Sequence, residues 1–433
     1  MSGESSMRIR ISKNQERTYF KVPFDVPADV ERLDIGYQYT RYSLTASGNV
    51  TTRREINIID LAVERPDGSF AGASGSNRKE ITLSAMDSTP GYARAPIMQG
   101  RWQIILGAYH VMDDGVTVAI DIRIIHKTLR RFFGDTHMHT THSDGALSVQ
   151  ELVTLSKQQG LDFMILTDHN IYPDLHFLPE CDALTIIPGM EWTHYQGHAG
   201  LYCQTQPIRN PFCVNDAQQA KAKLTEAQAA GATLVLNHPF SEPECGWRFG
   251  LDLVDFDAVE VWNGPLMTDS NAACLAWWHE QLCAGKHIPV IGGSDFHRIG
   301  VMTLPGLPTT ALYAMSREPD DLLHAIRAGH AYVKMTPDAP DIDMHCADSI
   351  MGDSIPMGGV VDVSIWGLRG GDVVCRITDR ECHTAEMPPD TVRYSETYEV
   401  ADMRFVRYEV KRKMGGLPSV TVALTNPIYA EVK

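Results

Sequence analysis

Residues 133–145 read FGDTHMHTTHSDG, and a second polar stretch, TDHN, follows at residues 167–170. In the first stretch, three histidines and two aspartates fall within ten residues, at the end of an apolar run. Burying imidazoles and carboxylates at this density is unfavourable unless something binds them, and a metal ion is the usual reason. We therefore expect a metal site here, completed by residues from other parts of the chain.

The length and composition indicate a soluble protein of two or three domains. The chain has 433 residues, of which 43% are hydrophobic and 21% charged, and this is long for a single core. The net charge of −16 argues against broad nucleic-acid binding through phosphate contacts. A small anionic substrate stays open, because bound divalent metals reverse the local field.

Two further observations favour a cytoplasmic protein. No apolar run has the length of a membrane span, and the first residues, MSGESSMRIRISKNQ, have no signal-peptide core, so no membrane association is expected. The nine cysteines occur singly from Cys181 onward, without a CxxC pair. This pattern is typical of a reducing compartment and gives no sign of a thiolate zinc site.

The chain is divided by its patterns into three parts. Residues 1–130 contain short segments rich in Val and Ile, such as RIRIS and VTVAIDIRII, separated by Pro, Gly and Asp turns. They predict an antiparallel β-sandwich or jelly-roll-like domain. We interpret it as a packing or oligomerisation module, with a contribution to substrate specificity as the alternative. A homo-oligomer is left open.

In residues 131–336 the predicted elements repeat in the order strand, polar loop, helix. Ser148 and Glu151 form a capping-box pattern at the start of a helix, and Asn215 is a plausible N-cap of a helix over residues 216–230. Apolar strands that alternate with helices indicate a mainly parallel sheet, and the polar residues follow the strands, where α/β barrels place their active sites. We predict a barrel-like α/β domain here. Residues 337–433 read as a β-rich segment, either separate or packed on the barrel.

The histidines and carboxylates of the middle part recur at successive strand ends. Thirteen of the seventeen histidines lie between His137 and His330. The i, i+2 spacing of HMH places both imidazoles on one side of a strand, and DFH repeats this spacing. The candidate metal ligands are His137, His139, Asp144, His169, Glu191, His198, His238, Asp295 and His297.

The ordered motifs resemble the PHP (polymerase and histidinol phosphatase) metallohydrolases, and the three-part layout is similar to their carbaryl-hydrolase-like CehA/McbA branch. The matching motifs are HMH at 137–139, SDG at 143–145, LTDHN at 166–170, GMEW at 189–192, GH at 197–198, NHP at 237–239 and GGSDFH at 292–297. The resemblance implies a distorted (β/α)7 TIM-like barrel that holds two or three divalent metals.

The resemblance also implies a division of the ligands. One metal would take His137, His139, Glu191 and Asp295; a second would share Glu191 with His198 and His238; a third would take Asp144, His169 and His297. Imidazole and carboxylate ligands suit Zn, Mn or Fe without choosing among them. Asp168 is interpreted as a partner that orients a ligand. For His142 a substrate contact and a solvated loop position stay open, and His194 is equally open.

Such a site indicates a metal-dependent hydrolase whose nucleophile is a metal-bridging hydroxide. The first hypothesis is a phosphoesterase that cleaves a phosphomonoester or phosphodiester of a small substrate. Arg298 would either bind an anionic group or be an ordinary surface arginine, and His169 or His297 would protonate the leaving group if the third metal is absent. The alternatives are hydrolysis of a carbamate, amide or ester, and a non-catalytic metal-binding scaffold. Substrate choice is expected in loops such as residues 241–250.

Overall fold

The computed structural model describes residues 3–47, 50–175, 178–179, 181, 183–203, 206–241, 243, 245–415 and 419–431. The chain divides into two compact units, Met1–Thr128 and Leu129–Lys433. The predicted division into three domains stays a prediction. No helix in the described part of the chain is long and apolar enough to cross a membrane.

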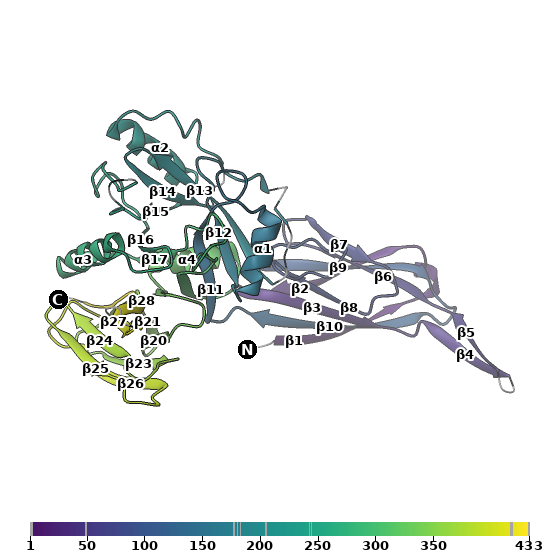
Figure 1. Cartoon of the computed structure of the whole chain (residues 1–433). Coiled ribbons are helices and arrows are strands. Elements are labelled where there is room, and N and C mark those ends of the chain that lie inside the picture. The colour runs from purple at the N-terminus through teal and green to yellow at the C-terminus, as the bar shows by residue number, and fades with distance from the viewer. Residues whose placement is uncertain are drawn as a thin grey trace. The chain divides into compact units, whose positions relative to one another are not determined.

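The first unit consists of antiparallel sheets, as its alternating Val and Ile pattern predicts (Figure 1). One sheet has the order β1 (Gly3–Ile11), β10 (Val116–His126), β3 (Val30–Gln38) and β8 (Glu80–Ser84); a second has the order β2 (Tyr19–Val26), β9 (Gly100–His110), β6 (Ile58–Glu64) and β7 (Phe70–Ser74). A hairpin, β4 (Tyr42–Ser47) and β5 (Val50–Glu55), projects from one end (Figure 1). Alternate side chains of both four-stranded sheets share one apolar core, with Ile35 and Ile104 fully buried.

The second unit is built on one large mixed sheet. Its first nine strands, in spatial order, are β17 (Val290–Gly293), β16 (Ala258–Asn263), β15 (Thr233–Asn237), β14 (Gly197–Tyr202), β13 (Thr185–His194), β12 (Phe163–Leu166), β11 (Arg130–Met138), β18 (Thr309–Ala314) and β19 (Ala331–Lys334). β12 and β15 are buried along their whole length, as expected of strands covered on both faces.

The structure differs in two respects from the predicted distorted (β/α)7 barrel with its mainly parallel sheet. The sheet is not parallel throughout, because β14 pairs antiparallel with both β13 and β15, and β18 pairs antiparallel with β11. A turn of two residues joins β13 to β14, and a connection that short can only produce an antiparallel pair. No closed barrel is formed by the described strands: beyond β17, a single bridge joins Phe296 to Met138.

Four α-helices belong to the described part of this unit: α1 (Val149–Gln158), α2 (Ala217–Ala229), α3 (Asp269–Cys283) and α4 (Pro319–Ala328). The predicted capping box of α1 is confirmed, since the Ser148 hydroxyl accepts from Glu151 N and the Glu151 carboxylate accepts from Ser148 N. The predicted cap of α2 is wrong by one residue, because Asp216 and not Asn215 caps it.

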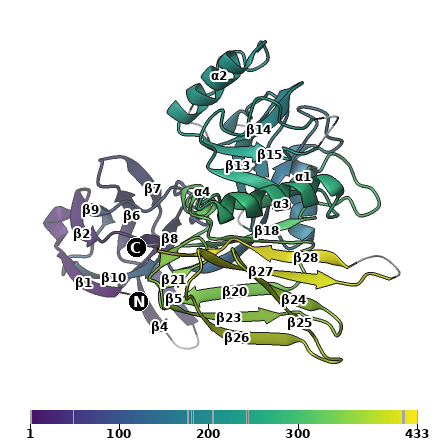
Figure 2. The ribbon, with the colours of Figure 1, turned by 90° about the vertical axis from the view of Figure 1, so that its left-hand side faces the viewer.

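The C-terminal strands continue the large sheet instead of forming a separate core. After β19 the sheet continues with β28 (Val420–Thr425), β27 (Phe405–Arg412), β24 (Val373–Thr378) and β25 (Cys382–Glu386), while β29 (Ile428–Ala430) pairs with β27 and with β22 (Ser354–Ile355). A further sheet contains β21 (Ser349–Ile350), β20 (Asp341–Cys346), β23 (Val360–Trp366) and β26 (Arg393–Glu399) (Figure 2). Trp278 of α3 and Phe405 of β27 belong to the same apolar core. Of the two open alternatives, the structure therefore has the segment packed on the α/β part.

Candidate metal centre

The nine candidate ligands come from different strands and meet at one end of the large sheet. His137 lies next to the last residue of β11, His139 follows that strand directly, and Asp144 lies in the loop after it; His169 follows β12; Glu191 lies in β13; His238 follows β15; Asp295 and His297 follow β17. These strands run parallel apart from β14, which is reversed and carries His198 at its start. Its start therefore lies at the same end as the carboxyl ends of its neighbours.

Glu191 lies at the centre of this cluster. Its side chain is fully buried, and five imidazoles surround its two carboxylate oxygens. Oε1 lies 3.3 Å from His137 Nε2, 3.2 Å from His198 Nδ1 and 3.1 Å from His238 Nε2; Oε2 lies 3.6 Å from His139 Nε2 and 3.0 Å from His169 Nδ1. A carboxylate with imidazoles on both oxygens has the arrangement of a ligand shared by two metals.

Two further carboxylates complete the cluster. Asp295 Oδ1 lies 3.4 Å from His137 Nε2 and 3.1 Å from His139 Nε2. Asp144, more than half exposed, places Oδ1 3.6 Å from His169 Nε2 and 3.2 Å from His297 Nε2. The structure therefore brings all nine candidate ligands together. Their short contacts form three sets, which are similar to the three metal-ligand sets that the PHP resemblance implies.

The donor atoms of this cluster suit a metal ion. In the described part of the chain, the buried ligand atoms without a hydrogen-bond partner are His139 Nδ1 and four atoms that lie within 3.6 Å of another ligand: His137 Nε2, His139 Nε2, Glu191 Oε2 and Asp295 Oδ1. Leaving such atoms unsatisfied is unfavourable, and a bound cation would satisfy all four. Two of the groups whose atoms could share one ion are His137, His139 and Asp295, and His139, Asp144, His169 and His297. A set of imidazoles and carboxylates suits Zn, Mn or Fe.

Glu260 of β16 is a member of the site that sequence reasoning missed. Its Oε1 accepts from His137 Nδ1 at 3.0 Å, and its Oε2 accepts from the backbone N–H of His238 and from Asn263 Nδ2, both at 3.1 Å. One buried carboxylate thus orients an imidazole of one ligand set and the backbone of another. The available signal was a glutamate inside the otherwise apolar strand AVEVWN.

Three other residues lie around the cluster. Asn237 donates from Nδ2 to Glu191 Oε1 at 2.9 Å. Cys245, in the loop expected to influence substrate choice, places Sγ 3.5 Å from His238 Nδ1, and this sulfur could share an ion with His198 and His238; Glu242 and Glu244 of that loop lie outside the described residues. Asp168 accepts from the backbone and hydroxyl of Thr140, at 2.8 and 2.7 Å. It therefore anchors the loop that follows His139.

The backbone is strained at the same place. His238, Asp295 and Asn170 have φ values of 27°, 50° and 54°, a region that side-chain-bearing residues rarely adopt. Gly293 is required by close packing, because a Cβ there would lie 2.4 Å from the Cβ of His137. Strain held by surrounding structure is typical of functional sites.

Burial and the neighbouring charges act in opposite directions on the pKa values of these groups. Burial lowers the pKa of His137, but Glu191, Asp295 and Glu260 outweigh it and hold that pKa well above its ordinary value. Burial raises the pKa of Glu191, but His137 and His198 outweigh it and hold it well below the ordinary value. The imidazoles and carboxylates of the cluster therefore attract one another.

Three predicted or open residues lie outside the cluster. Arg298 follows His297 and is exposed, so its side chain is free to contact an anionic group. His194 is held structurally: its Nε2 lies 3.1 Å from Val214 O, and its Nδ1 accepts from Gln196 N. His142 is exposed, and the choice between a substrate contact and a solvated loop position stays open.

Part of the chain that carries this centre is similar to a known family. Residues 135–242 match the PHP domain family. A stretch of 39 residues is 46% identical to DNA polymerase/3′-5′ exonuclease PolX of Bacillus subtilis (strain 168). That match covers 9% of this chain and only 7% of the polymerase's length.

Solved structures are similar to parts of the chain at low identity. A two-domain protein of Bacteroides vulgatus ATCC 8482 that contains a PHP-like metal-dependent phosphoesterase is 18% identical with a TM-score of 0.40, over 69% of this chain and 96% of that one. A metal-dependent phosphoesterase of Bifidobacterium adolescentis ATCC 15703 is 15% identical with a TM-score of 0.28, over 40% and 90%. An amidohydrolase of Chromobacterium violaceum with bound sulfate is 14% identical with a TM-score of 0.28, over 39% and 89%.

Proposed function

We propose that the chain is a metal-dependent phosphoesterase that hydrolyses a phosphomonoester or phosphodiester of a small substrate. The observation that carries this proposal is the position of Glu191 between five imidazoles. Such a carboxylate can hold two divalent metals close enough to share one oxygen ligand. Bound metals would supply a water-derived nucleophile at neutral pH and would neutralise charge on the attacked phosphate.

The residues of the chain would divide the remaining tasks. His137, His139, His198, His238, Asp295 and Glu191 would hold the first two metals. Arg298, exposed beside His297, would bind a non-bridging phosphate oxygen. Where the third set of ligands holds no metal, His169 or His297 would donate a proton from Nε2 to the leaving oxygen.

The alternative is hydrolysis of a carbamate, amide or ester, as the resemblance to the carbaryl-hydrolase-like branch suggests. Its support is the apolar character of the segment after His297, where Ile299 is 61% and Val301 95% exposed. Exposed apolar residues next to a metal centre suit a substrate with an apolar group. A non-catalytic scaffold is the third possibility, but it predicts missing ligands, and all nine candidate ligands meet in the structure.

One experiment separates these functions. The purified full chain is loaded with Mn, Zn or Fe and assayed on an aryl phosphomonoester, an aryl phosphodiester and an aryl carbamate with the same leaving group. We expect turnover of a phosphate ester, abolished in Glu191→Gln and retained in Glu280→Gln, an exposed glutamate of α3. Turnover of the carbamate alone would overturn the phosphoesterase proposal. Bound metal without any turnover would favour the scaffold.

A further inference from the structure

A second candidate binding site lies in the first unit, at the base of the β4–β5 hairpin. It is a pocket of about 660 Å³, within the range of small-molecule sites. Its lining residues are Tyr37, Gln38, Tyr39, Arg41, Tyr42, Leu44, Arg53, Ser76, Asn77, Arg78 and Lys79. We call it the cationic pocket. It shares no residue with the metal centre.

The charged side chains that line this pocket are all cations. Four cations line it, and no aspartate or glutamate is among its described lining residues. Arg41 is neutralised, since its Nε lies 2.5 Å from Glu55 Oε1. Arg53, Arg78 and Lys79 have no carboxylate partner in the described part of the chain. A concave surface with three uncompensated cations concentrates field lines and attracts anions.

This charge is local and does not follow from the bulk composition. The whole chain has a net charge of −16, and residues 1–128 hold 16 Lys and Arg against 15 Asp and Glu. A nearly neutral unit has therefore gathered four cations around one cavity, and the carboxylates next to it, Glu55 and Asp60, bind Arg41 and the backbone N–H of Ser76. Cations of like sign repel one another, so their proximity is unfavourable unless an anion joins them.

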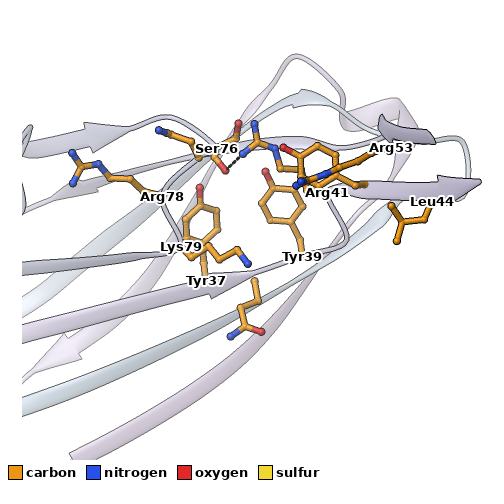
Figure 3. A pocket seen from close by; sticks show the side chains of 11 residues that line it. Tyr37, Tyr39, Arg41, Leu44, Arg53, Ser76, Arg78 and Lys79 are labelled. Carbon is orange, nitrogen blue, oxygen red and sulfur yellow. Dashed lines mark hydrogen bonds between the residues drawn. The ribbon is translucent and has the colours of Figure 1, made fainter. Parts of the chain in front are cut away.

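Tyrosine rings form the other part of the wall. Figure 3 shows Tyr37 and Tyr39 side by side, with Arg78 beyond Tyr37 and with Arg41 and Arg53 beyond Tyr39. Their hydroxyls are occupied, because both donate to Ile59 O, at 3.2 and 3.3 Å. Both rings are therefore held in place. Tyr37 is 1% exposed and belongs to the apolar core, so of the two it is the half-buried ring of Tyr39 that can offer apolar surface to a ligand.

A third ring already contacts a cation. The guanidinium of Arg53 lies 3.4 Å from the centroid of Tyr42, so this arginine is held flat against an aromatic face. A guanidinium placed in this way can stack on a planar ligand and can also contact its charged group. The pocket thus combines aromatic rings with positively charged side chains.

We propose that the cationic pocket binds a small organic anion that consists of a planar ring and a phosphate or carboxylate group. The cations select the charged group, and Tyr39, Tyr42 and Arg53 select the ring. A single concave pocket suits a small molecule better than a long polyanion, which requires an extended basic track. The proposal does not depend on the reaction at the metal centre.

The test is a calorimetric titration of the full chain after removal of metals by chelation. The probes are phenylphosphonate, benzoate and inorganic phosphate; the first two share the ring and differ in the anionic group. We expect phenylphosphonate or benzoate to bind at least about fivefold more tightly than inorganic phosphate, and to weaken with salt. Arg78→Gln and Lys79→Gln should each weaken binding by about threefold to tenfold.

Arg101→Gln is the matched control, because Arg101 is exposed on β9, lies outside the lining and loses the same charge. It should bind the probes like the wild type, and all variants should keep the wild-type melting temperature. Equal weakening in Arg101→Gln would overturn the proposal, as would binding unchanged by Arg78→Gln and Lys79→Gln. Inorganic phosphate binding as tightly as phenylphosphonate would overturn the ring requirement. Binding of an oligonucleotide without binding of these probes would assign the surface to a polyanion instead.

Discussion

Replacing Glu260 by glutamine tests whether the metal centre depends on a residue that contacts no substrate. The change keeps the size of the side chain but replaces one oxygen by an NH2 group. Glu260 now accepts from His137 Nδ1 and from the backbone N–H of His238. An amide has only one oxygen, so Glu260→Gln can serve one of these donors and must oppose the other.

The loss of metal affinity can be estimated from the two orientations that the glutamine amide can take. If its NH2 group faces His137, Nδ1 must accept, the ring proton moves to Nε2, and Nε2 can no longer bind a metal. If it faces His238, two N–H groups oppose each other in a buried site. Loss of such an orienting partner typically lowers metal affinity by about 10-fold to 100-fold, or about 1.4–2.8 kcal/mol.

The assay is a competitive titration of the metal-free chain with Zn and a chromogenic chelator, followed by metal analysis after dialysis. Near-ultraviolet circular dichroism reports whether the variant is folded. Glu280→Gln makes the same chemical change at an exposed position of α3 and should leave the affinity unchanged. A folded Glu260→Gln chain with wild-type zinc affinity would refute the orienting role of this carboxylate.

Three further outcomes follow from contacts in the structure. Glu191→Ala should lower the metal content after dialysis as well as the activity, because five imidazoles converge on this carboxylate; unchanged metal content would show that our ligand assignment is wrong. Arg298→Ala should raise KM for an anionic phosphate ester by about 5-fold to 10-fold and leave the metal content unchanged; an unchanged KM would make Arg298 an ordinary surface residue. Asp34→Asn should destabilise the chain at pH 7 by about 1–3 kcal/mol, measured by urea unfolding. Burial raises the pKa of Asp34, but hydrogen bonds from Arg32 and Arg123 outweigh it and lower that pKa. Its stabilising contribution is therefore present above about pH 3.9 and is lost as the pH falls through the lowered value, so the effect of Asp34→Asn should shrink there; a difference that persists at low pH would contradict this cause.

Much of the candidate site could be predicted from the sequence because the information is local. The HMH and DFH spacings place alternate side chains on one side of a strand, and an apolar run before each polar pair marks a strand end. Ser148 and Glu151 cap α1 through their own backbone, so no distant residue was needed to predict that helix start. The alternating Val and Ile pattern likewise predicts the antiparallel sheets of the first unit.

Other features depend on contacts between distant segments, and only the tertiary structure decided them. The reversal of β14 brings His198 to the cluster from the start of a strand, and it leaves the sheet mixed where a parallel barrel was expected. Glu260 looks like an ordinary strand residue until His137 and the backbone of His238 are seen to bond its two oxygens. The cationic pocket joins residues of three segments that share no motif. The sequence by itself determined which side chains could bind a metal. Their convergence on Glu191 required the folded sheet, because residues 54 positions apart, such as His137 and Glu191, become neighbours only through strand pairing.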